Sequence, residues 1–172
     1  MRDNDTIAAI ATAHGRSAIG IIRISGPGVE DILHEHVPSI RPRNATLVNF
    51  CDDKNEKIDS VIMIYYKSPH SYTGEDLLEI QTHGNPIILG KILNILCPKY
   101  ARQARAGEFT ERAFLNNKID LLQAEATIDL INSSSIAAAN SAMKSLSGTY
   151  SNQVSEIKSD IIKTRSSIEA II

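Results

Sequence analysis

The spacing of the apolar residues changes near Asp120, which limits the chain to a sheet-containing part followed by a helical part. Before this point, apolar residues come in short runs separated by turn residues, as in strands and short helices. The runs that predict strands are 6–11, 19–25, 46–50, 58–66 and 77–81. The predicted helices are 29–36 and one that begins at Pro86, after the capping residue Asn85, and stops at Pro98. This order, β-β-α-β-β-β-α, predicts an α+β fold.

From residue 121 onward, the apolar residues follow the spacing of an α-helix. The serines at 133–135 are expected to break or cap the first helix, and a long helix is expected to run from there to the C-terminus. Two series recur every seven residues, Tyr150, Ile157, Thr164 and Ile171, and Val154, Ile161 and Ile168. They form the a/d seam of an apolar helix face. Because the sequence stops inside this pattern, at Ile171 and Ile172, we expect a longer protein or a partner-dependent helix.

The overall composition excludes several classes of function. The chain has 172 residues, 42% hydrophobic and 22% charged, which predicts a packed globular core. Its net charge of −2 lacks the basic excess of a nonspecific nucleic-acid binder, although Lys99, Arg102, Arg105 and Arg112 could form a local basic patch. There is no signal segment and no apolar run of the ~20 residues needed to span a bilayer. We therefore expect a cytoplasmic protein without a membrane partner.

Two polar blocks combine charges with aromatic residues. Residues 106–118 hold two acids, an arginine, a lysine and two phenylalanines, and residues 71–76 (SYTGED) lead to Glu79 and His83. A plain amphipathic helix requires no such opening, so the blocks predict a site for a flat, charged ligand. The second block could also be only a polar turn, because Ser, Thr, Gly and Asp are common turn residues. Turn chemistry does not explain Tyr72.

Arg23 and Glu79 each lie in an otherwise apolar strand, and each has two interpretations. Arg23 is either an edge-strand residue that reaches solvent or a half-buried guanidinium that pairs with a carboxylate ligand. Glu79 alternates with Leu78 and Ile80, which is typical of the solvent face of a sheet. Its carboxylate could instead accept the paired N–H donors of a pterin or guanine edge.

The remaining polar residues form no self-contained catalytic constellation. Lys118 by itself looks like a surface lysine at a helix entrance, and His83 like a capping-loop residue, although a helix N-terminus can also receive an anion. The histidines share no metal-ligand spacing and Cys51 and Cys97 form no CxxC motif, so no metal site is predicted. The sequence also has no Walker A loop and no nucleophile elbow.

Several longer motifs carry a resemblance to a known family. They are 5–12 (DTIAAIAT), 15–16 (GR), 19–26 (IGIIRISG), 71–76 (SYTGED), 107–110 (GEFT), 112–116 (RAFLN) and 118–121 (KIDL). With them, the chain resembles the N-terminus of the MnmE (TrmE) family of tRNA modification GTPases over essentially its whole length. The resemblance implies a mixed-sheet domain at 1–118, similar to the folate-binding domains of aminomethyltransferases. It also implies that 119–172 are the first long helices of a helical bundle.

The resemblance further implies a function. The family uses a one-carbon tetrahydrofolate, 5-formyl- or 5,10-methylene-tetrahydrofolate, in the 5-(carboxymethyl)aminomethyl modification of wobble uridine U34 in tRNA. It acts with the flavoprotein MnmG (GidA), and the N-terminal domain mediates homodimerisation. GTP, Mg²⁺ and K⁺ belong to a GTPase domain that lies further along in the family. This sequence does not include that domain, so the chain alone is not expected to hydrolyse GTP.

Three residues match the folate contacts of the family, namely Arg23, Glu79 and Lys118. In the implied arrangement, Glu79 accepts the pterin N–H pair, and Arg23 and Lys118 face the glutamate tail or polar ring atoms. Tyr72 or Phe109 stacks on the pterin. Two alternatives stay open: a stand-alone aminomethyltransferase-like protein that uses folate, and a purely structural dimerisation module.

The sequence departs from the family pattern at three places. Ala13-His14 replaces a usual Pro-Pro, Asn85 replaces a second glycine after His83-Gly84, and Ala106 replaces a common proline. Asn85 has the most bearing on ligand access near His83, because a glycine allows a close backbone approach there.

Overall fold

The computed structural model describes residues 5–37 and 39–170, and the chain divides into two compact units at Asn116/Asn117. The first unit is built on a six-stranded sheet in the order β3-β4-β5-β2-β1-β6. Its strands are β1 (Ile7–Ile10), β2 (Ser17–Ser25), β3 (Ala45–Cys51), β4 (Lys57–Tyr66), β5 (Leu77–Gly84) and β6 (Arg102–Gln103). Its helices are α1 (Val29–His36), α2 (Pro86–Lys99) and α3 (Glu108–Leu115). The strand pairs are antiparallel except for β1 with β6, so the predicted α+β fold with a mixed sheet is confirmed.

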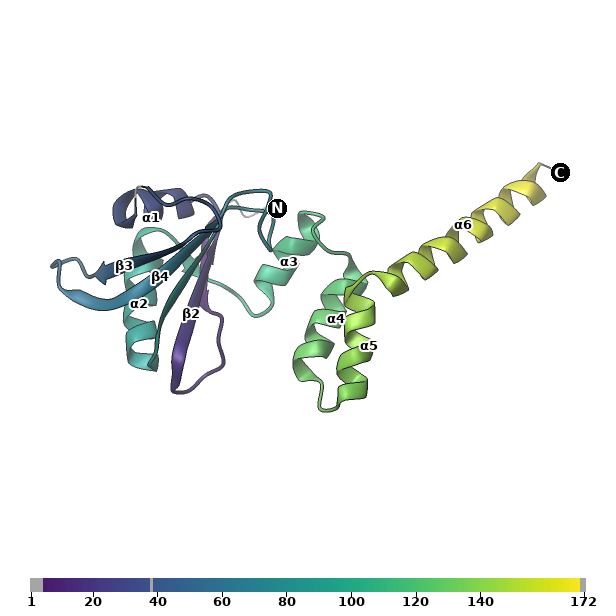
Figure 1. Ribbon diagram of the computed structural model, residues 1–172. Coiled ribbons are helices and arrows are strands. Elements are labelled where there is room, and N and C mark those ends of the chain that lie inside the picture. Colours follow the sequence, from purple (N-terminus) through teal and green to yellow (C-terminus); the bar gives the residue numbers. More distant parts are fainter. Residues whose placement is uncertain (1–4, 38, 171–172) are drawn as a thin grey trace. The chain divides into compact units, whose positions relative to one another are not determined.

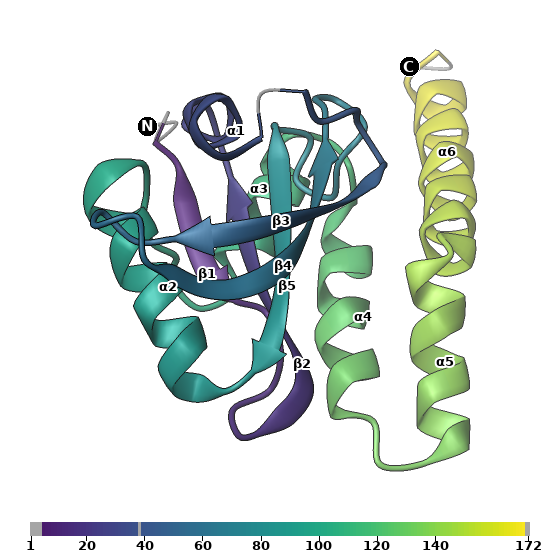
Figure 2. The same cartoon turned by 60° about the vertical axis from the view of Figure 1, so that its left-hand side comes forward.

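One face of the sheet forms the core under α1 and α2 (Figures 1 and 2). On β2, Ile22 and Ile24 point into this core, whereas Ile21 and Arg23 lie on the other face, as the two-residue period of a strand requires. Helix α2 packs directly on β2 at Gly20, where an added Cβ would come within 2.7 Å of the side chain of Leu89. The opposite face is therefore the one on which polar side chains of β2 and β5 can gather.

Strand β6 and the end of helix α2 differ from the predictions. Strand β6 was not predicted, because it is only two residues long and is defined by its pairing with Ile7 and Ala8 rather than by a sequence period. Helix α2 does not stop at Pro98 but includes it in its last turn and ends at Lys99. A proline there removes one helical hydrogen bond close to the helix end, which costs less than it would in the middle.

Asn85 caps α2, as predicted. Its side-chain Oδ1 accepts a hydrogen bond of 2.9 Å from the N–H of Ile87, and Pro86 occupies the first position of the helix. Asn85 itself has φ −99°, a conformation open to any residue. Asn85, which stands where the family pattern has a glycine, therefore serves as the helix cap and places no strain on the backbone beside His83.

Replacing Asn85 by alanine is expected to lower the free energy of unfolding by about 1 kcal/mol, because the first turn of α2 loses its side-chain acceptor. Asn85→Gly should cost only a few tenths of a kcal/mol, since glycine is itself tolerated at an N-cap. Urea unfolding of the two variants beside the wild type measures both values. Equal losses for alanine and glycine would contradict a capping role.

The second unit consists of α4 (Leu121–Asn132), α5 (Ile136–Leu146) and α6 (Thr149–Glu169). Asp120 and Gln123 form a capping box at the start of α4, and Ser135 caps α5 through a hydrogen bond from the N–H of Ala138. The predicted break at 133–135 is confirmed. The single long helix predicted after it is wrong: Gly148, with φ +81°, divides it into α5 and α6.

The predicted seven-residue seam lies on α6 and is exposed in the described part of the chain. The exposed fractions of its large side chains range from 42% for Val154 to 63% for Ile161. Ile171 and Ile172, on which the prediction also rested, lie outside the described residues. Over 5–37 and 39–170, no helix combines the length and apolar character needed to cross a bilayer.

Candidate functional site

Arg23 and Glu79 face each other across two interior strands of the sheet. The register of β2 and β5 pairs the two residues directly, on the face opposite α1 and α2. Arg23 Nη2 lies 2.7 Å and Arg23 Nε 3.0 Å from the same oxygen, Glu79 Oε1. Their side chains are 29% and 14% exposed. Because β2 lies between β5 and β1, the interpretation of Arg23 as an edge-strand residue is wrong.

Two aromatic rings flank this ion pair. The guanidinium carbon of Arg23 lies 5.4 Å from the ring centre of Tyr72 and 5.9 Å from that of Phe109, within the range of cation–π attraction. Tyr72 comes from the loop before β5, and Phe109 from the first turn of α3. Arg23, Phe109 and the 72–79 segment are far apart in sequence, so the fold brings four of the five predicted site residues together.

The arrangement suits a planar group with adjacent N–H donors. The Arg23 guanidinium is such a group: it is flat, it donates two hydrogen bonds to one carboxylate, and its face meets aromatic rings. Both of these hydrogen bonds end on Oε1 of Glu79. The carboxylate has further acceptor sites on its second oxygen, so it can take a donor from a ligand beside the arginine.

Tyr66 also lies near Glu79, and it was not predicted as a site residue. Burial raises the pKa of Tyr66, and the negative charge of Glu79 raises it further. In the sequence, Tyr66 ends a nearly all-apolar strand and is indistinguishable from a core residue. Only the register, which sets Ile64 opposite Glu79 and so places Tyr66 on the same face, reveals its position.

Lys118, the fifth predicted residue, belongs to the second compact unit. Its part in a folate site therefore stays a prediction.

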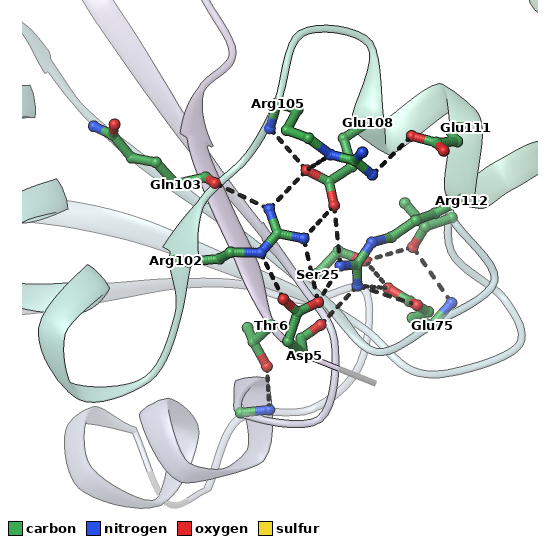
Figure 3. A network of polar contacts seen from close by, with 12 residues as sticks. Asp5, Thr6, Ser25, Glu75, Arg102, Gln103, Arg105, Glu108, Glu111 and Arg112 are labelled. Carbon is green, nitrogen blue, oxygen red and sulfur yellow. Dashed lines mark hydrogen bonds and ion pairs between the residues drawn. The ribbon is translucent and has the colours of Figure 1, made fainter. Parts of the chain in front are cut away.

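The predicted basic patch does not exist as a free positive surface. Each of its four members is within ion-pair distance of a carboxylate: Lys99 of Glu35, Arg102 of Asp5 and Glu108, Arg105 of Glu108 and Glu111, and Arg112 of Asp5, Glu75 and Glu108. Three of the four side chains, those of Arg102, Arg105 and Arg112, therefore belong to one network around α3, shown in Figure 3.

Arg112 is the centre of this network (Figure 3). Its side chain is only 8% exposed, and it lies 2.7 Å from Asp5, 3.1 Å from Glu75 and 3.3 Å from Glu108. Arg102 adds a second bridge between Asp5 and Glu108. Hydrogen bonds from Arg102 lower the pKa of Glu108, an effect that outweighs the burial of its carboxyl. The Glu108 carboxylate is therefore held in the ionised form.

A second polar cluster lies at the far end of β5. The buried Asp59 carboxylate accepts hydrogen bonds from the Thr82 hydroxyl and from the N–H groups of Ser60 and His83, and it lies 2.8 Å from His83 Nδ1. Burial opposes ionisation of Asp59, but the hydrogen bonds lower its pKa to about 2. His83 is the next-to-last residue of β5, and the capping position belongs to Asn85. The capping-loop interpretation of His83 is therefore wrong.

The fold and the residue cluster together define a class: a mixed-sheet domain with charged and aromatic side chains gathered on one face, followed by helices that form a separate unit. The sequence model described as "GTP-binding protein TrmE N-terminus" matches residues 6–118, and that of the "MnmE helical domain" matches residues 121–172. The chain belongs to the MnmE/TrmE family, and it corresponds to the N-terminal domain and the start of the helical domain.

Named relatives agree with this assignment. The tRNA modification GTPase MnmE of Saccharophagus degradans is 48% identical over 171 residues, which cover 98% of this chain and 37% of the relative. The protein of the same name from Francisella tularensis subsp. holarctica (strain FTNF002-00 / FTA) is 51% identical over 173 residues, which cover 100% of this chain and 38% of the relative. The chain thus spans less than two fifths of the length of these relatives.

Proposed function

We propose that the first unit binds a one-carbon tetrahydrofolate at the Arg23–Glu79 pair, with Tyr72 and Phe109 beside the pterin. The observation that carries the proposal is the meeting of these four residues, taken from three separate segments, on one face of the sheet. The donor and acceptor chemistry fits, because the Glu79 carboxyl group accepts hydrogen bonds and a pterin presents a flat edge with adjacent N–H donors. Two aromatic faces can stack on such a ring.

In this proposal, Glu79 and Arg23 share the recognition of the ligand. The pterin edge takes the acceptor sites of Glu79 that Arg23 does not use, and Arg23 supports the charge of Glu79 while facing the polar ring atoms or the glutamate tail. Lys118 is proposed as a further contact to the negative parts of the folate. A stand-alone Arg23–Glu79 ion pair would need no aromatic rings on its exposed side, which favours a ligand site over a purely structural pair.

The wider role follows from the family. We propose residues 1–118 as a folate-binding and homodimerisation domain, and 119–172 as the first helices of the helical domain. In the whole protein they serve the 5-(carboxymethyl)aminomethyl modification of wobble uridine U34 in tRNA, in the cytoplasm and with the flavoprotein MnmG. GTP hydrolysis, with Mg²⁺ and K⁺, would then belong to a GTPase domain outside this sequence.

Calorimetric titration with 5-formyltetrahydrofolate tests the ligand site. We expect saturable binding by the wild type and a loss of at least about tenfold in affinity, or 1.4 kcal/mol, for Arg23→Ala and for Glu79→Ala. Lys91→Ala is the matched control, because it removes a charged side chain from an exposed ion pair with Asp52 elsewhere in the same unit.

The outcomes separate the alternatives. Absence of binding by the folded wild type would contradict the folate proposal and favour a structural dimerisation module. Wild-type affinity in Glu79→Gln, which keeps the shape but loses the charge, would overturn the role given to Glu79. Sedimentation of the same preparations measures whether the chain forms the expected homodimer.

A further inference from the structure

We infer that the ion network centred on Arg112 and two uncharged contacts beside it, Asn116 with Thr73 and Tyr72 with Thr110, together position the two aromatic rings of the ligand site. This inference rests on the proposed function, because it assigns a role within the same site. Figure 3 shows the network at the junction of the N-terminal segment, the loop before β5 and the first turns of α3. The last two of these segments each carry one of the rings that lie beside Arg23.

The loop that carries Tyr72 is held at residues on both sides of the ring. Ser71 Oγ donates to the Glu75 carbonyl oxygen, and Thr73 Oγ1 lies 2.6 Å from Ser25 Oγ on β2. Ser25 also donates to Glu75 Oε2, which in turn lies 3.1 Å from Arg112 Nη1. Tyr72 therefore sits on a short loop whose neighbouring residues are tied to the end of β2 and to the network.

Helix α3, which carries Phe109, is held by the residues next to that ring. Glu108 directly precedes Phe109, is 2% exposed, and receives hydrogen bonds from Arg102 and from the N–H of Arg105. Arg112, one turn later, bonds both the main-chain oxygen and the carboxylate of Asp5. A fully paired network with Arg112 and Glu108 buried at its centre has few alternative arrangements, so it fixes the rotation of α3 and the direction of Phe109.

Two uncharged contacts join the loop and the helix directly. Asn116 Nδ2 donates to the Thr73 carbonyl oxygen over 2.7 Å, and Tyr72 Oη lies 3.0 Å from Thr110 Oγ1. Arg112 and these two contacts thus set the spacing between Tyr72 and Phe109. Because stacking depends on ring distance and orientation, a small shift of either ring would weaken the hold on a flat ligand without touching Arg23 or Glu79.

The experiment uses Asn116→Ala and Thr110→Val, which remove the two uncharged contacts and leave every charge of the network in place. Asn85→Ala is the matched control, since it also removes one side-chain hydrogen bond to the main chain but at the start of α2. Two quantities are measured: the Kd for 5-formyltetrahydrofolate, and the NMR resonance of the Arg23 Nε–H in the chain without ligand, which we expect the ring currents of Tyr72 and Phe109 to displace.

We expect Asn116→Ala and Thr110→Val to raise the Kd about five- to tenfold and to shift the Arg23 Nε–H resonance, while Asn85→Ala changes neither. If the contacts of Asn116 and Thr110 only stabilised the fold, all three variants would behave alike. Wild-type Kd values in Asn116→Ala and Thr110→Val would overturn the inference, whether or not the resonance moves.

The two proposals can fail separately. If the wild type does not bind 5-formyltetrahydrofolate, the proposed function fails, and the resonance alone then decides whether the contacts between α3 and the loop before β5 position the rings. An unchanged resonance in both variants would show that they do not.

Discussion

Replacing Arg112 by methionine is expected to lower the free energy of unfolding by about 3–5 kcal/mol. Methionine fills a similar length but removes the cation that lies among Asp5, Glu75 and Glu108. Burial disfavours the charge of Arg112, yet its pKa is raised above the ordinary value because Glu75 and the hydrogen bonds to Asp5 outweigh that cost. Without the Arg112 cation, the carboxylates of Asp5, Glu75 and Glu108 lose a buried positive partner. Removing one partner of a buried ion pair costs far more free energy than removing one partner of a surface pair.

Urea unfolding followed by tyrosine fluorescence suits this test, because most tyrosines lie in the first unit. They are Tyr65, Tyr66, Tyr72 and Tyr100. The control is Lys91→Met, which removes a single ion pair with Asp52. The Lys91 side chain is 50% exposed. That change should cost no more than about 1 kcal/mol. Similar losses for the two variants would mean that the network contributes no more than an ordinary surface pair.

The strands and the first helices were predictable because each has a period of its own. The alternation along β2 placed Ile22 and Ile24 on one face and Arg23 on the other before any pairing was known. Elements defined by their neighbours were not predictable. Strand β6 exists only through its two-residue pairing with β1, and the break at Gly148 depends on a left-handed conformation that a glycine permits but does not require.

The site was predictable as a set of residues but not as a geometry. The two polar blocks and the resemblance selected Arg23, Tyr72, Glu79 and Phe109, and the structure brings these four together. That Arg23 pairs with Glu79 follows from the β2–β5 register, which involves residues 56 positions apart and has no local signal. The basic residues around 99–112 failed as a predicted patch partly for the same reason, because Asp5, Glu35 and Glu75 reach them from distant segments, while Glu108 and Glu111 are close in sequence.

Asp59 gives the clearest pH dependence, at the end of the sheet away from the ion network. Its folded pKa of about 2 lies below the ordinary value of 3.8: burial raises it, but the hydrogen bonds from Thr82 and His83 lower it more. A depressed carboxyl pKa means that the unfolded chain binds more protons in acid. The resulting stability is therefore fully present above about pH 5 and is lost as the pH falls through about 2.

The difference of nearly two units corresponds to about 2 kcal/mol at neutral pH. We expect Asp59→Asn to lower the free energy of unfolding by about that amount at pH 7, and the gap to the wild type to shrink steadily as the pH falls from about 5 to about 2. Urea unfolding across this range measures the gap directly. Asp53→Asn, an exposed carboxyl in the turn between β3 and β4, is the control and should show no comparable gap at any pH. A constant gap for Asp59→Asn would instead mean that the asparagine disturbs packing around Thr82, because a packing defect does not depend on protonation of residue 59.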